Sequence, residues 1–194
     1  ILQICRENKL EFFISGNGSN LLVSDKGYRG VVIQLWKNFS DIETEDNTIT
    51  VKAGTLLSKV AAEALEESLT GMEFASGIPG TMGGAVMMNA GAYGGEMKDI
   101  IREVTVLTRE GELLTLSKEE MNFGYRTSVV KEKGYVVISA VLQLRKGDRE
   151  EIRKVMDELK ERRVTKQPLD MPSAGSTFKR PEGYFAGKLI MDAG

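Results

Sequence analysis

The sequence predicts a fold in which strands and helices alternate, and three observations lead to this prediction. Short strand-like apolar segments recur between residues 11 and 144. Two segments, 56–67 and 150–163, carry apolar residues at helical spacing instead. Two glycine-rich segments, 16–20 and 77–84, lie about 60 residues apart and are each flanked by apolar runs.

The first half of the chain predicts short strands followed by one helix. Residues 11–14 form a strand that ends at the first glycine-rich segment, residues 20–23 continue from it, and 31–35 and 49–53 are further strands. The helix 56–67 presents one apolar stripe formed by Leu57, Val60, Ala61, Ala64 and Leu65. Residues 84–90 are small and apolar, and they predict a helix or a buried stretch that leads into a turn at 89–95.

The second half predicts a hairpin, a long strand and a helix. Segments 104–107 and 112–116 flank Arg109-Glu110-Gly111, and Ser117 with Glu120 has the spacing of a capping box. Residues 135–144 form a strand, and the helix 150–163 carries Ile152, Val155, Met156 and Leu159 on one face. After Pro168 the composition changes to that of a linker or a new lobe, which continues in a helix at 184–191.

Composition excludes several function classes. The chain has 194 residues, 41% of them hydrophobic, and a net charge of −2, so we expect no nucleic-acid partner. No apolar run reaches the ~18 residues of a membrane span, and the single cysteine, Cys5, fits a reducing cytoplasm. The absence of histidine excludes Ser-His-Asp catalysis, histidine-ligated zinc and histidyl attachment of a flavin, and we expect no metal site.

The glycine-rich segments predict a site for a dinucleotide. They comprise Gly16, Asn17, Gly18, Ser19 and Asn20, followed by Leu21, and Gly77, Ile78, Pro79, Gly80, Thr81, Met82, Gly83 and Gly84, followed by Ala85. Glycine lets a backbone approach a pyrophosphate closely, and such turns can direct several N–H groups at one anion. The first segment does not have Rossmann or Walker spacing, which disfavours those folds. The alternative for the first segment is an ordinary strand-ending turn.

For three further groups of residues, the sequence leaves open whether they bind a ligand or have only a structural role. Tyr125-Arg126 is either a surface pair or a site at which the planar fork of Arg126 grips a carboxylate. Ser173, Ser176 and Thr177 lie in a proline- and glycine-rich stretch where serines commonly form turns. Lys166, Lys179 and Arg180 bracket that stretch and either hold a phosphate or are solvated surface charges.

Together these motifs resemble the UDP-N-acetylenolpyruvoylglucosamine reductase family. The resemblance rests on segments 16–22, 77–85, 89–94, 123–128 and 174–179, which occur in the family's order. The glycine motifs alone are also similar to the wider superfamily of FAD-dependent oxidoreductases typified by vanillyl-alcohol oxidase. The direct passage from Leu144 to the helix at 150 resembles a shorter branch of the family, which lacks a tyrosine-bearing insertion.

The resemblance implies an α+β fold in three parts. Residues 1–36 are expected to be the remnant of the first FAD-binding lobe, 37–165 the second lobe, and 168–194 the beginning of a substrate-binding lobe. The chain begins without Met and ends directly after an apolar run. We therefore expect a fragment that stops before the family's C-terminal catalytic glutamate.

The resemblance also implies an activity and a set of site residues. The activity is NADPH-dependent reduction of UDP-N-acetylglucosamine enolpyruvate in peptidoglycan precursor synthesis, with non-covalent FAD and no obligate protein partner. Arg126 matches the residue that stabilises the substrate carboxylate, and Ser176 matches the proton donor. Tyr125, Lys166 and Arg180 match substrate-binding positions, and Asn89 and Gly91 join the glycine-rich segments as FAD-binding positions. The alternatives are another flavin oxidase of the superfamily and a non-catalytic nucleotide-binding module.

Overall fold

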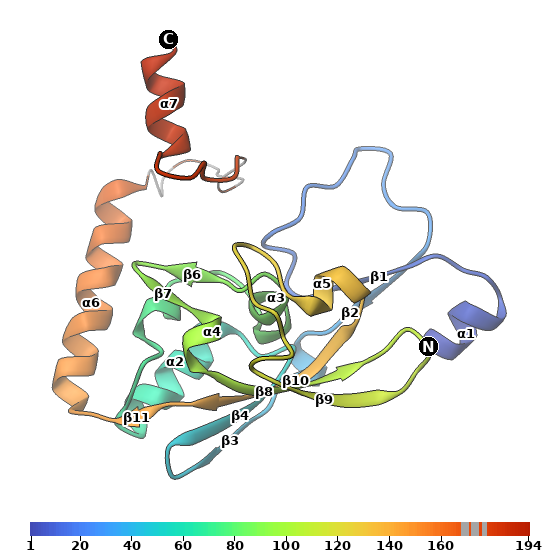
Figure 1. Ribbon diagram of the computed structural model, residues 1–194, viewed down its shortest axis with the longest axis horizontal. Coiled ribbons are helices and arrows are strands. Elements are labelled where there is room, and N and C mark those ends of the chain that lie inside the picture. Colours follow the sequence, from blue (N-terminus) through green and yellow to red (C-terminus); the bar gives the residue numbers. More distant parts are fainter. Residues whose placement is uncertain (168–170, 172–174, 176–177) are drawn as a thin grey trace.

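A five-stranded antiparallel sheet is the largest element of the computed structural model, which describes residues 1–167, 171, 175 and 178–194 (Figure 1). Its strand order is β3-β4-β10-β8-β9. The strands are β3 (Ile42–Glu45), β4 (Thr48–Lys52), β8 (Ile101–Leu107), β9 (Leu113–Ser117) and β10 (Val136–Gln143). The predicted hairpin of β8 and β9 is confirmed. Strand β3 was not predicted, because it has only four residues, two of them glutamates.

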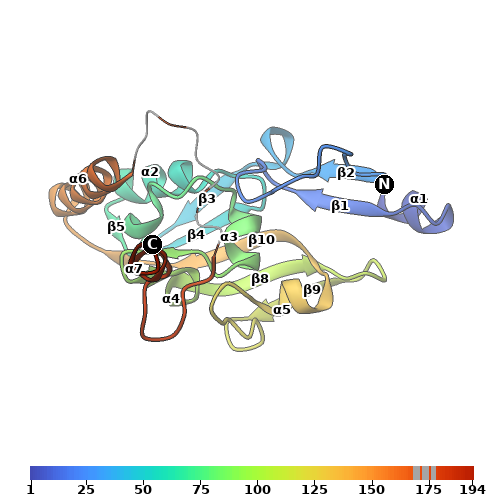
Figure 2. The same cartoon turned by 90° about the horizontal axis from the view of Figure 1, so that it is seen from above.

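Helices cover one face of this sheet (Figures 1 and 2). Helix α2 (Leu57–Glu66) buries all five residues of its predicted apolar stripe. Helix α3 (Met82–Met87) contacts β4 and β10, and it begins two residues before the predicted segment 84–90. The strands alternate accordingly: in β4, Ile49 and Val51 are fully buried, whereas Thr50 and Lys52 are exposed. The sheet therefore has one core face and one solvated face.

Short elements connect the sheet to its helical layer. They are the 3₁₀ turns η1 (Lys37–Phe39) and η2 (Glu73–Ala75), the helices α4 (Met97–Ile100) and α5 (Val129–Lys133), the antiparallel pair β5 (Leu69–Thr70) and β11 (Arg145–Lys146), and the hairpin of β6 (Gly91–Ala92) and β7 (Gly95–Glu96). The β6–β7 hairpin overlaps the turn predicted at 89–95, extends one residue beyond it, and borders the site described below.

The N-terminal segment forms a separate small unit at the opposite end of the molecule from α6 (Arg149–Lys166) (Figures 1 and 2). It contains α1 (Leu2–Glu7) and a parallel pair of β1 (Phe12–Ser15) and β2 (Val31–Gln34). Within α1, β1 and β2 only the side chain of Cys5 is buried. A two-stranded pair with so little core depends on neighbouring structure for its stability.

Two details of the prediction are corrected. Val155 is 40% exposed although it was placed on the apolar face of α6, which instead packs through Ile152, Met156 and Leu159. The helix lies along the edge formed by α2, β5 and η2, so only a narrow stripe of its surface is covered. The capping box forms both of its hydrogen bonds, Ser117 N to Glu120 Oε2 (2.8 Å) and Glu120 N to Ser117 Oγ (3.3 Å), but it closes a turn instead of starting a helix.

The last described element is α7 (Ala186–Asp192), at the place where the sequence predicts a helix. Its apolar residues Leu189, Ile190 and Met191 are exposed, so α7 adds no buried side chain to the core.

Candidate functional site

The two glycine-rich segments meet in the structure, as the sequence predicts. Ser19 Oγ donates a hydrogen bond to the carbonyl oxygen of Pro79. A Cβ atom at Gly16 would collide with the side chain of Thr81, and a Cβ at Gly80 would lie 3.8 Å from Ser19 Oγ. The N-terminal unit and the helical layer therefore approach one another through these two bends, and glycine at position 16 is required for the approach.

The first segment is held by its own backbone and by β2. Gln34 Nε2 donates to the carbonyl oxygen of Gly16 (3.0 Å), and Leu21 N donates to that of Gly18 (3.2 Å). Gly18 has a left-handed backbone with a φ of 79°, and nothing lies within 4 Å of a Cβ built there. Gly18, Ser19 and Asn20 are exposed, so this bend presents backbone to solvent where a phosphate can approach.

Some residues of the second segment are bonded to the core, and others lie at the surface. The amide of Met82 donates to Thr55 O and that of Gly83 to Ala53 O, both at 2.8 Å. A Cβ at Gly83 would lie 3.0 Å from Ala53 Cβ, so Gly83 packs closely against the strand end. Gly77, Pro79 and Gly84 are exposed, whereas Thr81 and Ala85 are buried. Fewer residues of this segment are therefore open to a ligand than the sequence predicts.

Asn89 organises the hairpin beside this segment. Its Oδ1 accepts a hydrogen bond from Lys98 N (3.0 Å), and its Nδ2 donates to Glu96 Oε2 (2.9 Å) and to Gly124 O (3.1 Å). The side chain is buried and bonded within the protein. Asn89 thus ties the β6–β7 hairpin to the turn at 124–127, while its predicted contact with FAD stays a prediction.

Tyr125 and Arg126 form the tip of that turn. Gly124 N donates to Thr127 O (3.1 Å), which closes the turn and leaves the two residues at its tip. Arg126 is partly buried, its Nη2 donates to the carbonyl oxygen of Gly91 (3.4 Å), and its guanidinium lies 5.5 Å from the Tyr125 ring centroid. The cation is therefore held over the β6–β7 hairpin, with further donors left for an anion.

The carboxylate of Glu96 lies in the same cluster. Its hydrogen bond with Lys98 Nζ (2.9 Å) lowers the pKa of Glu96, and the Asn89 amide and the charges of Lys98 and Arg126 act in the same direction. These effects outweigh partial burial, which raises the pKa. At neutral pH, Glu96 is therefore an anion, and it lies close enough to Arg126 for the two charges to attract one another.

The predicted substrate residues are only partly described. Arg180 N donates to the phenolic oxygen of Tyr125 (3.2 Å), which brings these two predicted residues together. The guanidinium of Arg180 lies 4.0 Å from the Phe185 ring centroid, and its Nε donates to Tyr184 O (3.1 Å). Ser176 and the side chain of Lys166 lie outside the described residues.

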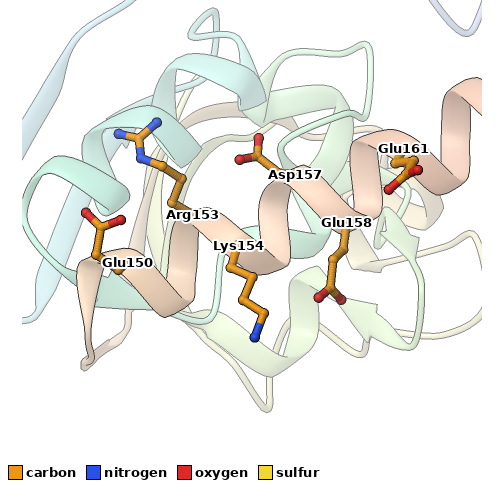
Figure 3. Close-up of a pocket in the computed structure, with 6 residues that line it drawn as sticks. All are labelled: Glu150, Arg153, Lys154, Asp157, Glu158 and Glu161. Carbon is orange, nitrogen blue, oxygen red and sulfur yellow. The ribbon is translucent and has the colours of Figure 1, made fainter.

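Two hollows lie along α6, and they differ in character. The first, of about 350 Å³, is lined only by charged side chains of α6, which Figure 3 shows splayed along the helix: Glu150, Arg153, Lys154, Asp157, Glu158 and Glu161. Such alternating charges on one helix form a solvated face. The second, of about 200 Å³, lies between α6, Phe74, Gly77 and Tyr93, and it includes Arg163. Arg163 was not predicted as a site residue, because helical spacing alone gives no sign of what this residue contacts.

Within the described ranges, no helix is long and apolar enough to cross a membrane. Across the same residues, no group of three or more His, Cys, Asp or Glu side chains is placed to hold a metal ion.

The comparisons with known proteins agree with this geometry. Residues 1–117 match the family model described as "FAD binding domain". UDP-N-acetylenolpyruvoylglucosamine reductase from Alkaliphilus oremlandii is 53% identical over 193 residues, covering 100% of this chain and 64% of the relative. The enzyme of the same name from Caldanaerobacter subterraneus is 55% identical over 194 residues, with the same two coverages.

A solved structure is also similar. The crystal structure of UDP-N-acetylenolpyruvylglucosamine reductase from Thermus caldophilus superposes with a TM-score of 0.84 at 40% identity, covering 98% of this chain and 69% of that one. The fold and the converging glycine-rich segments thus define an FAD-binding α+β protein. The chain belongs to the UDP-N-acetylenolpyruvoylglucosamine reductase family. It spans about 64% of the length of the curated relatives cited above.

Proposed function

We propose that this chain is the FAD-binding part of an enzyme that reduces UDP-N-acetylglucosamine enolpyruvate to UDP-N-acetylmuramate, with NADPH as co-substrate. This reaction belongs to peptidoglycan precursor synthesis, which we place in the cytoplasm. The observation that carries the proposal is the meeting of the bend at Gly16–Ser19 with the bend at Pro79–Thr81. In this proposal residues 1–36 and 37–165 form two FAD-binding lobes, and 168–194 begin the substrate-binding lobe.

The residues at the two bends fit the diphosphate of FAD. An added Cβ at Gly16 would fill the space against Thr81, and Gly18 offers its backbone with no side chain in the way. The remaining FAD-binding positions are those predicted from the sequence in the two glycine-rich segments, together with Asn89 and Gly91. When bound, FAD supplies hydride transfer between NADPH and the enolpyruvyl double bond.

Arg126 is proposed to bind the substrate carboxylate. Negative charge develops next to this carboxylate during reduction of the double bond, so a fixed cation there stabilises the transition state more than the ground state. Two contacts of the guanidinium, with Gly91 O and with the Tyr125 ring, support this role. They fix the cation before substrate binds. Ser176 is proposed to donate the proton that the adjacent carbon requires, a step worth roughly 10² to 10⁴ in rate.

Tyr125, Lys166 and Arg180 are proposed to bind the UDP-sugar. The hydrogen bond from Arg180 N to Tyr125 OH supports a shared role for these two residues, because it joins the segment that contains Arg180 to the turn that carries Arg126. Lys166 is proposed to face the diphosphate of the substrate as a point charge.

Ser176→Ala tests this proposal in the full-length protein by stopped-flow absorbance of the flavin. We expect bleaching by NADPH at the wild-type rate, followed by recovery with UDP-N-acetylglucosamine enolpyruvate that is slowed about 10²-fold or more. Ser173→Ala, in the same stretch, is the matched control and should leave both phases unchanged. Normal recovery in Ser176→Ala removes the assignment of that residue, whereas a wild-type protein that takes up no FAD overturns the proposed function.

A further inference from the structure

Two buried polar side chains connect the end of α3 to the turn that carries Arg126. Asn89 is 2% exposed, and Ser128 is fully buried. Burial of a polar group costs free energy unless the group is hydrogen-bonded, so the partner of each side chain indicates what the residue does. In both cases at least one partner lies in the other of these two segments.

Ser128 is the N-cap residue of α5, but its hydroxyl has a distant partner. A serine at this position usually accepts a hydrogen bond from an N–H group in the first turn of its helix. Within the described part of the chain, the Ser128 side chain forms no such cap, and its Oγ donates to the carbonyl oxygen of Met87 at 2.9 Å. Met87 ends α3, where carbonyl groups lack partners within the helix. The hydroxyl therefore serves a tertiary contact and not the local helix.

Asn89 follows the end of α3 and contacts the other side of the same turn. Its backbone is left-handed, with a φ of 42°. Its Nδ2 donates to Gly124 O at 3.1 Å and to Glu96 Oε2 at 2.9 Å. An amide group has two N–H donors, so both are used within the protein. The side chain of Asn89 therefore joins the turn to the end of α3 and to the β6–β7 hairpin.

The two contacts hold both ends of the turn at one place. Gly124 and Ser128 lie two residues before and two residues after Arg126, and both are bonded to residues at the C-terminal end of α3. The N-cap of this helix is Thr81, which approaches the first glycine-rich bend. A helix of six residues is about 9 Å long, and backbone hydrogen bonds fix that length. Helix α3 is therefore a rigid spacer between the two glycine-rich bends and the turn of Arg126.

We propose that Ser128 and Asn89 are positioning residues, which fix Arg126 relative to bound FAD by clamping its turn to α3. The inference rests on the proposed function, in which Arg126 binds the substrate carboxylate and the two bends bind the diphosphate of FAD. A cation stabilises a transition state most when it is held where negative charge develops. A displacement of about 1 Å can slow a reaction by roughly 10²-fold. Loss of either bond therefore slows reduction of the substrate and spares reduction of the flavin by NADPH.

Ser128→Ala in the full-length, FAD-loaded protein tests the inference by stopped-flow absorbance of the flavin. We expect reduction by NADPH at the wild-type rate. Reoxidation by saturating UDP-N-acetylglucosamine enolpyruvate should slow by about tenfold, because the guanidinium is less closely fixed. The dissociation constant of this substrate should change less than the rate of reoxidation, because the cation acts mainly on the transition state.

A double-mutant cycle with Arg126→Met separates positioning from a general loss of stability. Two residues that act through one interaction have non-additive effects. In the Arg126→Met background, Ser128→Ala should therefore cause no further slowing of reoxidation. Thr108→Val is the matched control, because the buried Thr108 hydroxyl also bonds to backbone, accepting from Glu110 N and Glu112 N in the β8–β9 turn. This control should leave the rates of reduction and reoxidation unchanged.

The outcomes distinguish this inference from the proposed function. Slowing by Ser128→Ala that persists in the Arg126→Met background overturns the inference alone, and so does a wild-type rate of reoxidation in Ser128→Ala. A wild-type flavin that the enolpyruvyl substrate does not reoxidise overturns the proposed function together with the inference. If Ser128→Ala does not fold, the same cycle with Asn89→Gly decides, because glycine tolerates the left-handed backbone. Failure of both variants to fold overturns the inference, because the two bonds would then be a requirement of folding.

Discussion

Arg126 occupies the tip of its turn with a left-handed backbone, at a φ of 58°. Residues other than glycine rarely adopt this conformation, so surrounding contacts have to maintain it. Those contacts are the paired backbone of Gly124 and Thr127 and the hydrogen bond to Gly91 O. The arginine is thus presented by a strained turn of defined geometry, which suits the carboxylate-binding role proposed for it.

The Glu96 carboxylate gives this cluster a pH dependence whose sign follows from its lowered pKa. Because the folded protein holds Glu96 ionised more readily than the unfolded chain, its stabilising contribution is complete above about pH 4.5, the ordinary pKa of the group. The contribution is lost as the pH falls through the lower, folded-state pKa. We expect Glu96→Gln to destabilise the protein at pH 7 and to approach the wild-type free energy of unfolding at acid pH.

Urea denaturation at a series of pH values measures this convergence. Glu161→Gln, on the solvated face of α6, is the control, because that side chain is exposed. A destabilisation by Glu96→Gln that stays constant from pH 7 to the acid limit would show that the lost interaction is one of packing and not of charge.

At the scale of single residues, what the sequence could predict depended on motifs. Tyr125-Arg126 is a two-residue motif, and the structure holds its guanidinium against Gly91 O and the Tyr125 ring. The binding of a carboxylate by Arg126 stays a prediction. Arg163 is one of several charged residues in a helix whose periodicity describes only apolar burial. Its contacts with Gly77 and Tyr93 join segments about 70 to 90 residues apart, and no local pattern reports such contacts.

At the scale of elements, periodicity located the helices well. It predicted the buried face of α2 correctly but not that of α6. The stripe of α2 is buried in full, because this helix packs on the core. Helix α6 lies at the edge, where its neighbours are α2, β5 and η2, so one of its four predicted apolar residues is exposed. The two ends of the capping box also formed where no helix follows, because its hydrogen bonds require only one turn of backbone.

A pair of substitutions on α6 tests this account of its packing. Ile152 is 4% exposed and Val155 is 40% exposed, although helical spacing places both on one side. We expect Ile152→Ala to lower the free energy of unfolding by about 2–4 kcal/mol, because it leaves a cavity beneath the helix. We expect Val155→Ala to change it by less than about 1 kcal/mol, because surface substitutions seldom cost more and alanine favours the helix.

Urea denaturation followed by circular dichroism provides both values, with Val155→Ala as the matched control for Ile152→Ala. Equal losses from the two substitutions would mean that α6 is covered on its Val155 side as well, for instance by another copy of the chain.

At the scale of the whole molecule, the N-terminal unit is joined to the remainder through the two glycine-rich bends and through Arg6, whose Nη1 donates to Arg109 O (2.8 Å). Its own buried surface is small, whereas β10 lies at the centre of the five-stranded sheet. Sequence patterns located β1 and β2, and the glycine motifs predicted that the segment at 77–84 shares a site with this unit. No local pattern reports how the two are joined, through Ser19 with Pro79 and Gly16 with Thr81. That relation depends on tertiary contacts.

The difference in buried surface between the N-terminal unit and the five-stranded sheet predicts where bound FAD changes the dynamics of the protein. Without FAD, backbone amides of β1 and β2 should exchange with deuterium faster than those of β10, because local opening requires less free energy where few contacts are broken. A cofactor bound across both bends at about 100 times its dissociation constant adds roughly 2.7 kcal/mol to any opening that releases it. Exchange in β1 and β2 should then slow by about 100-fold, as measured by mass spectrometry of the full-length protein.

Gly16→Ala should abolish this protection, because the added Cβ meets Thr81, whereas Gly187→Ala in α7 adds its Cβ to open space and should preserve it. Protection confined to β10, with β1 and β2 unchanged, would place the cofactor away from the N-terminal unit and separate it from the first bend.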